Sequence, residues 1–167
     1  MKWVVGASLL MPETPKVINL GIYFPAPMPH LLSDFPLRTW DKIRYADTDR
    51  QGHVNNAVFS SFLETGRVEC LYHPDYPILS PGGSFVIAAL NLNFLKEITW
   101  PGQVDIGTGV RRIGTSSIRL YQQLFQGETC VATAETVIVQ VNAATASSEP
   151  LSEAAKATLS RWLLPEP

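Results

Sequence analysis

The sequence contains little charge, and no long run of one sign. Lys, Arg, Asp and Glu make up 17% of its residues, and the formal net charge is −2. The charged fraction of globular domains is typically ~25%. The longest basic run is the pair Arg111 and Arg112. These features do not indicate a nucleic-acid partner or a basic membrane-binding stretch, whereas an anionic small molecule would need only one or two cations.

Cysteine and long apolar runs are also scarce. The two cysteines, Cys70 and Cys130, are too few for a disulfide scaffold in a chain of 167 residues. We therefore expect both to be reduced in a cytoplasmic protein. No apolar stretch approaches the ~20 residues that span a bilayer, so we expect no membrane partner.

Proline is concentrated at one end of the chain. Six of the 13 prolines fall between residues 11 and 38, and this density excludes regular helix and central strand. We predict a Pro-rich N-terminal extension over residues 1–36, a folded domain over 37–145, and a C-terminal helix and tail over 146–167. Hydrophobic residues are 46% of the chain, enough for the core of one domain.

Periodicity predicts one main helix and five strands. A strand is expected over 39–46 and a helix over 56–72, where the apolar residues recur at helical spacing: Phe59, Phe62, Leu63, Gly66 and Cys70. Alternating and β-branched segments predict four more strands, at 86–94, from 104, at 118–124 and at 130–141, with a last amphipathic helix over 152–164. Short turns make these strands antiparallel, so the order predicts a two-layer α+β domain.

The loop before the main helix combines groups suited to acyl transfer. Asp49 and His53 lie within eight residues of a helix start at Asn55 or Asn56. Free N–H groups at a helix start can bind the oxygen of a thioester carbonyl as it gains charge, and a nearby carboxylate can attack the carbonyl or activate water. Gly52 permits the tight turn between them. On the residues alone, a plain capping loop is the stronger interpretation.

The same residues resemble a known family. The matching residues are 45–49 (YADTD), 52–57 (GHVNNA), Phe62, Glu64 and Arg67 in the helix, and 112–117 (RIGTSS). They resemble hotdog thioesterases of the 4-hydroxybenzoyl-CoA thioesterase type that carry a GHVNN sequence. The resemblance covers about residues 37–141. It implies the hotdog fold, an antiparallel β-sheet wrapped around one long central α-helix.

The resemblance implies an acyl-CoA thioester hydrolase that releases a carboxylic acid and free CoA. Asp49 would be the base or nucleophile, and the backbone N–H of Asn56 would bind the oxyanion. The family uses no metal and no other cofactor. It forms homodimers or homotetramers, with active sites between subunits, and binds acyl-CoA as its substrate.

Several further residues are candidates with two interpretations each. Some relatives have histidine at the position of Asn56, so His53 could orient Asp49 or a water here, or could be an ordinary loop histidine. Glu64 is expected to form an ion pair with Arg67, three residues away. The turn around Thr115 could bind CoA phosphates or be merely solvated. The substrate-binding candidates are Gly52, Asn55, Glu64, Arg112, Thr115 and Ser116.

Two other functions compete with hydrolysis. A hydratase or dehydratase on the same fold would use a histidine and a carboxylate in a different helix motif, which the sequence lacks. A non-catalytic acyl-thioester binding protein would keep the fold and lose the carboxylate, and the presence of Asp49 argues against it.

Overall fold

The computed structural model describes residues 30–165, so most of the predicted extension over residues 1–36 lies outside the described residues. The elements, in chain order, are two short 3-10 turns, two α-helices and five strands: η1 (Leu32–Asp34), β1 (Leu37–Ile43), η2 (Tyr45–Asp47), α1 (Asn56–Leu71), β2 (Gly83–Phe94), β3 (Gly102–Ile113), β4 (Ser117–Gln126), β5 (Thr129–Asn142) and α2 (Glu153–Ser160). No helix in this part of the chain is long and apolar enough to cross a membrane.

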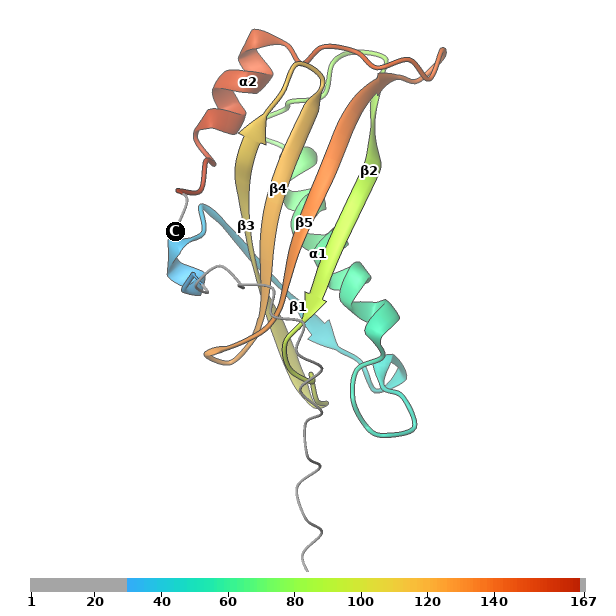
Figure 1. Cartoon of the computed structure of the whole chain (residues 1–167), viewed down its shortest axis with the longest axis vertical. Helices are drawn as coiled ribbons and strands as arrows, with labels where there is room; N and C mark the ends of the chain where they lie inside the picture. Colours follow the sequence, from blue (N-terminus) through green and yellow to red (C-terminus); the bar gives the residue numbers. More distant parts are fainter. Residues whose placement is uncertain (1–29, 166–167) are drawn as a thin grey trace, which may run out of the picture.

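The five strands form one antiparallel sheet in the order β1-β3-β4-β5-β2 (Figure 1). Tight turns join β3 to β4 and β4 to β5, which explains why these strands are neighbours. The first two strands are placed at the two edges, and β2 pairs only with β5. The prediction of antiparallel strands is confirmed. The first strand ends earlier than expected, at Ile43, because Tyr45 and Ala46 belong to η2.

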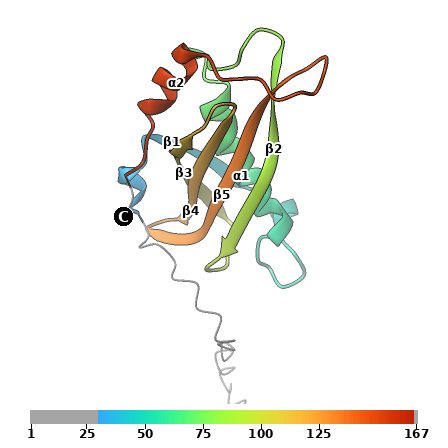
Figure 2. The same cartoon turned by 45° about the horizontal axis from the view of Figure 1, so that its top comes forward.

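α1 packs against one face of this sheet, as both views of the cartoon show (Figures 1 and 2). It begins at the predicted residue and ends one residue earlier than expected. All five apolar residues of the predicted stripe are buried. The expected long central helix is not confirmed, because α1 has 16 residues, close to the ordinary length of helices in globular proteins.

Gly66 lets α1 approach the sheet closely. A Cβ atom at this position would lie 2.6 Å from Cγ2 of Ile106 and 2.7 Å from both Nε2 of Gln122 and Oγ1 of Thr108. Nε2 of Gln122 also donates a hydrogen bond to the carbonyl of Leu63 over 3.0 Å, which ties β4 to the helix backbone. Glycine at this position therefore permits the close packing of α1 on β3 and β4.

Two residues near the ends of the described chain cover part of the other face of the sheet. The ring of Phe35 packs over Gly107 of β3, and Leu164 packs over Gly109. The last helix is shorter than predicted, because the tail after it turns extended: the carbonyl of Trp162 accepts a hydrogen bond from Val110 N–H over 2.8 Å. The tail thus pairs with β3 beyond the stretch that β1 occupies.

One arginine joins both ends of the described chain. Arg111 donates from Nη1 to the carbonyl of Pro165 over 2.6 Å, and its Nη2 lies 3.1 Å from Nε2 of His30. Its guanidinium also lies 4.5 Å from the ring centre of Tyr121.

The division of the chain at residues 36 and 145 remains a prediction.

Candidate active site

The loop between β1 and α1 closes into a tight turn at Asp49. The Asp49 N–H donates to the carbonyl of His53 over 2.8 Å, and the Gly52 N–H donates to the carbonyl of Asp49 over 3.1 Å. Gly52 has a φ of 85°, a conformation that costs glycine little. The turn brings the two residues flanking it, Thr48 and Val54, into an antiparallel bridge.

The Asp49 carboxylate has one occupied oxygen and one free oxygen. Oδ1 accepts hydrogen bonds from the backbone N–H groups of Gln51, over 2.8 Å, and His53, over 3.3 Å. Among the described residues, none donates to Oδ2. Two backbone donors fix the orientation of the carboxylate, and Oδ2 is the oxygen that no described residue occupies.

α1 begins immediately after this loop with a capped first turn. Asn55 is the N-cap, and its Oδ1 accepts a hydrogen bond from Ala57 N–H over 2.9 Å. Asn56 is the first helical residue and is exposed. Nothing in the described part of the chain accepts a hydrogen bond from its backbone N–H. That N–H therefore remains available at the positive end of the helix.

The His53 imidazole is held by a residue far away in sequence. Its Nε2 lies 3.0 Å from Oε2 of Glu97. The backbone on either side is also tied to this segment, because His53 forms a bridge with Thr99, and Val54 N–H donates to the carbonyl of Ile98 over 2.8 Å. His53 therefore contacts Asp49 through its main chain, while its ring faces Glu97.

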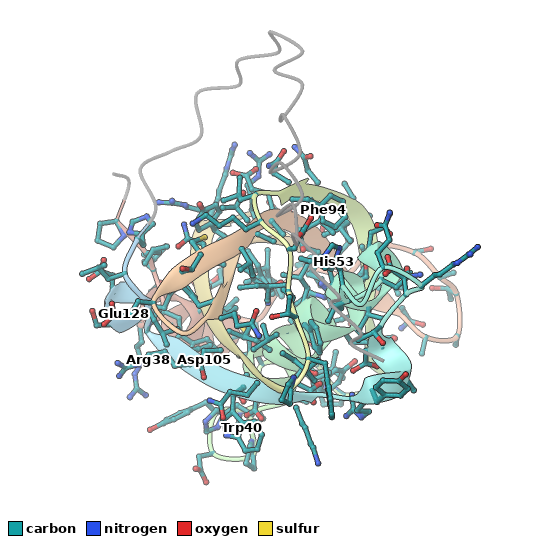
Figure 3. The ribbon with its side chains drawn as sticks, turned by 90° about the horizontal axis from the view of Figure 1, so that it is seen from below. Arg38, Trp40, His53, Phe94, Asp105 and Glu128 are labelled. Atoms are coloured by element: carbon teal, nitrogen blue, oxygen red, sulfur yellow. The ribbon has the colours of Figure 1, made fainter. Side chains whose placement is uncertain are left out.

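The loop, the start of α1 and the segment at the end of β2 line an open pocket of about 330 Å³. Ten residues line it: Asp49, Gln51, His53, Val54, Asn56, Phe59, Phe94, Leu95, Lys96 and Glu97. Seen from below, His53 and Phe94 project on the same side of the molecule (Figure 3). The rings of Phe59 and Phe94 meet edge to face, with centroids 5.0 Å apart. The pocket thus combines a polar wall with an aromatic one.

Glu64 and Arg67 do not lie as the sequence suggested. Glu64 is exposed, more than two turns along α1 from Asn56, and does not line the pocket. The expected ion pair with Arg67 is wrong, since the described chain contains no such contact within 4.0 Å. The physical reason is that the Arg67 side chain is buried, with 5% exposure, while Glu64 stays in solvent.

The remaining predicted residues form a second, separate pocket. It measures about 450 Å³ and lies around the turn between β3 and β4. Its lining is Arg112, Gly114, Thr115, Ser116, Ser117, Arg119 and Val137. Because β3 has 12 residues, its two ends are roughly 36 Å apart. One chain alone therefore does not bring Arg112, Thr115 and Ser116 next to Asp49.

Sequence reasoning missed the pocket residues at the end of β2 and just after it. Phe94 was expected to be a strand residue, and Lys96 and Glu97 carried no motif. Glu97 is 44 positions from His53 (97 − 53), so its contact could not be foreseen from spacing.

Of the cysteines, Cys70 is buried on α1, and burial raises the pKa of its thiol to about 12. Residues 30–165 contain no cluster of three or more His, Cys, Asp or Glu side chains suited to a metal.

An antiparallel sheet packed on one helix fits the α+β hotdog fold, and the match to a thioesterase family identifies the chain as a thioester hydrolase. Residues 43–162 match the thioesterase-like superfamily. The chain belongs to this family. None of the functionally curated proteins matches its sequence.

Three solved structures show the similarity. A thioesterase from Thermus thermophilus, complexed with coenzyme A and Zn, is 27% identical, with a TM-score of 0.66 over 75% of this chain and 93% of that one. A predicted thioesterase from Bacillus stearothermophilus is 25% identical, with a TM-score of 0.68 over 76% and 96%. The PA5185 protein of Pseudomonas aeruginosa is 19% identical, with a TM-score of 0.73 over 82% and 98%, and supports the fold alone.

Proposed function

We propose that this protein hydrolyses acyl-CoA thioesters, in the manner of the 4-hydroxybenzoyl-CoA thioesterase type. The observation that carries the proposal is the pairing of a free carboxylate oxygen, Oδ2 of Asp49, with a free helix N–H, at Asn56, in residues that line one pocket. The neighbour solved with coenzyme A supports CoA as the carrier.

The chemistry follows from these two groups. The Asn56 N–H donates to the carbonyl oxygen of the thioester and stabilises the charge it gains. In the base route, Asp49 Oδ2 takes a proton from water while the water oxygen adds to the carbonyl carbon. In the nucleophilic route, Oδ2 adds directly and water later cleaves the resulting anhydride. In both, the C–S bond breaks, CoA leaves as a thiolate, and the acyl group ends as a carboxylic acid. The proton that Asp49 took from water, or that cleavage of the anhydride releases, passes to the thiolate or to solvent, which regenerates the Asp49 carboxylate.

His53 assists hydrolysis by holding the loop and the Asp49 carboxylate in position. Its backbone N–H holds Oδ1 of Asp49, and its imidazole is fixed against Glu97. An oriented carboxylate loses less freedom on reaching the reacting geometry. Phe59 and Phe94 form an apolar surface that the acyl group can contact next to this carboxylate.

Binding of the nucleotide end of CoA requires a second copy of the chain. The turn pocket near Arg112 carries two arginines and hydroxyl groups suited to phosphates, yet it lies farther from Asp49 than a pantetheine arm reaches. Val86 of β2 and Ser117 of β4 both pair with Val139, so the turn pocket lies at the N-terminal end of β2. The acyl pocket lies at the C-terminal end, at Phe94.

A twofold dimer through β2 would bring the two pockets together. The outer edge of β2 has no strand partner in the described sheet, and an open edge is a ready site for pairing. Antiparallel pairing of two β2 strands sets the acyl pocket of one copy beside the turn pocket of the other. We propose a homodimer of this kind, alone or within a homotetramer.

The direct test is a panel of acyl-CoA substrates of different acyl length and aromatic character. The assay follows free thiol with a chromogenic reagent and the acyl product by mass spectrometry. Hydrolysis predicts stoichiometric release of CoA and acid. Binding without turnover would indicate a carrier or scaffold protein, and hydration of an enoyl thioester without thiol release would indicate a hydratase.

A further inference from the structure

Gln126 holds the main chain of Thr99 with both ends of its side-chain amide. Oε1 accepts a hydrogen bond from Thr99 N–H over 3.1 Å, and Nε2 donates to the Thr99 carbonyl over 2.7 Å. Gln126 is the last residue of β4, and 27 positions separate it from Thr99. A residue in an antiparallel strand exchanges the same two bonds with the residue opposite it. The glutamine amide therefore pairs with Thr99 as a neighbouring strand would.

Thr99 pairs on its other edge with the loop before α1. It forms an antiparallel bridge with His53, and the bond beside this bridge runs from Val54 N–H to the carbonyl of Ile98 over 2.8 Å. In an extended strand, a residue directs its N–H and carbonyl to one edge, and its neighbours direct theirs to the other edge. The segment at Thr99 therefore lies between the loop and Gln126 like the middle strand of a small sheet.

The loop side of this arrangement ends on the Asp49 carboxylate. His53 donates its N–H to Oδ1 of Asp49 over 3.3 Å, and its carbonyl accepts the Asp49 N–H over 2.8 Å. The turn between β4 and β5 and the loop before α1 lie at the same end of the sheet (Figure 1). The turn that presents Oδ2 is thus attached to β4 through His53, Thr99 and Gln126 in series.

We propose that Gln126 is a positioning residue for thioester hydrolysis. It holds the segment at Thr99 in place beside the loop, and so keeps the Asp49 carboxylate directed at a carbonyl bound at the start of α1. Misplacement of a catalytic group by about 1 Å can cost ~100-fold in rate. This inference rests on the proposed function, and it adds a residue that does not line the acyl pocket.

Hydrogen exchange tests the attachment without any substrate. Gln126→Leu removes both bonds to Thr99, so the peptide over residues 47–55 should exchange about fivefold faster than in wild type. The Gln126 side chain is partly exposed, and Ile98 stays fully buried in the core, so the variant should fold. Gln126→Glu keeps the size and the acceptor but loses the donor at neutral pH, and it should also accelerate exchange.

Gln103→Leu is the matched control for the exchange measurement. The Gln103 side chain is also near the end of a strand, but it donates to Oδ1 of Asp105 over 2.7 Å and does not bond to Thr99. Exchange of the peptide over residues 47–55 should therefore stay at the wild-type rate. Wild-type exchange in both Gln126 variants would overturn the attachment.

Kinetics test whether the attachment serves catalysis. Well below the melting temperature, Gln126→Leu should lower kcat about tenfold and leave KM within about twofold. In an Asp49→Asn background, the same substitution should change the residual kcat by less than about twofold, because Gln126 acts through Asp49. An unchanged kcat in Gln126→Leu, or a full tenfold loss on top of Asp49→Asn, would overturn the positioning role. A wild-type protein that hydrolyses no acyl-CoA would overturn the proposed function and this role with it, while hydrogen exchange still decides the attachment.

Discussion

The backbone N–H of His53 donates to Oδ1 of Asp49 over 3.3 Å, while the ring of His53 turns to Glu97, 3.0 Å from Nε2. The histidine that follows the carboxylate in sequence thus orients it through the main chain. This arrangement separates the two residues by function: one carries the free oxygen, and the other fixes the turn that presents it.

His53→Ala is therefore expected to be mild. The substitution removes the contact with Glu97 and retains the backbone N–H that holds Asp49. We expect kcat to fall by less than about tenfold, well below the ~100-fold or more typical of a lost acid–base group. Steady-state kinetics check this, with Glu97→Gln as the matched variant on the other side of the contact. A loss of a hundredfold or more in His53→Ala would assign the proton transfer to the imidazole.

Gly66→Ala tests the close packing of α1 on the sheet. The added methyl would lie 2.6 Å from Ile106 and 2.7 Å from Gln122. Overpacking of this kind costs about 1–3 kcal/mol, against a gain of about 1 kcal/mol in helix propensity. We expect lower stability in urea unfolding. Ser61→Ala, at an exposed position of the same helix, should change stability by less than about 0.5 kcal/mol. A more stable Gly66→Ala protein would contradict this packing.

The sequence predicted α1 and the sheet better than it predicted the site. Helical spacing identified Phe62, Leu63 and Gly66 because burial of one helix face imposes that period. The pocket could be predicted only as far as its local half, from Asp49 to Asn56. Glu97 joins it because His53 forms a β-bridge with Thr99, and the whole of α1 and β2 lies between the two segments in sequence. Local pattern does not encode such a contact. The burial of Arg67 was missed for the same reason, since a charged residue at i+3 from an acid ordinarily forms a surface pair.

Arg112→Gln tests the proposed binding of CoA phosphates. Loss of one charged contact should raise KM for acyl-CoA several-fold and leave kcat nearly unchanged, because the residue is remote from the reacting bond. The same substitution should leave hydrolysis of an acyl-pantetheine thioester unaffected, because that substrate lacks the nucleotide. Arg38→Gln, on the exposed face of β1, is the matched control. Equal loss with both substrates would contradict the assignment.

His30 makes the attachment of the described N-terminal segment sensitive to pH. Burial, and then the charge of Arg111, lower the pKa of His30 below its ordinary 6.5, while Asp34 opposes them. The neutral ring is the form suited to the 3.1 Å contact with Arg111. Because the folded pKa is depressed, the contribution to stability is present above about pH 6.5 and is lost as the pH falls through the folded value. We expect wild type to melt slightly above His30→Gln at pH 8, with the difference vanishing at pH 5. An equal difference at both values would contradict the mechanism.

Asp49 is the residue that we propose performs the chemistry. Asp49→Asn keeps the shape of the side chain and removes the charge that abstracts a proton or attacks the carbonyl. Two matched carboxylates serve as controls. Asp47 lies in the same loop, but its Oδ2 already accepts a hydrogen bond from Arg44 N–H over 2.7 Å, and Glu64 lies outside the pocket.

The most direct measurement is the steady-state kinetics of these three variants with the best acyl-CoA of the panel. We predict that Asp49→Asn lowers kcat by at least ~100-fold with little change in KM, whereas Asp47→Asn and Glu64→Gln each lose less than about tenfold. An active Asp49→Asn enzyme together with a nearly inactive Glu64→Gln enzyme would contradict the account.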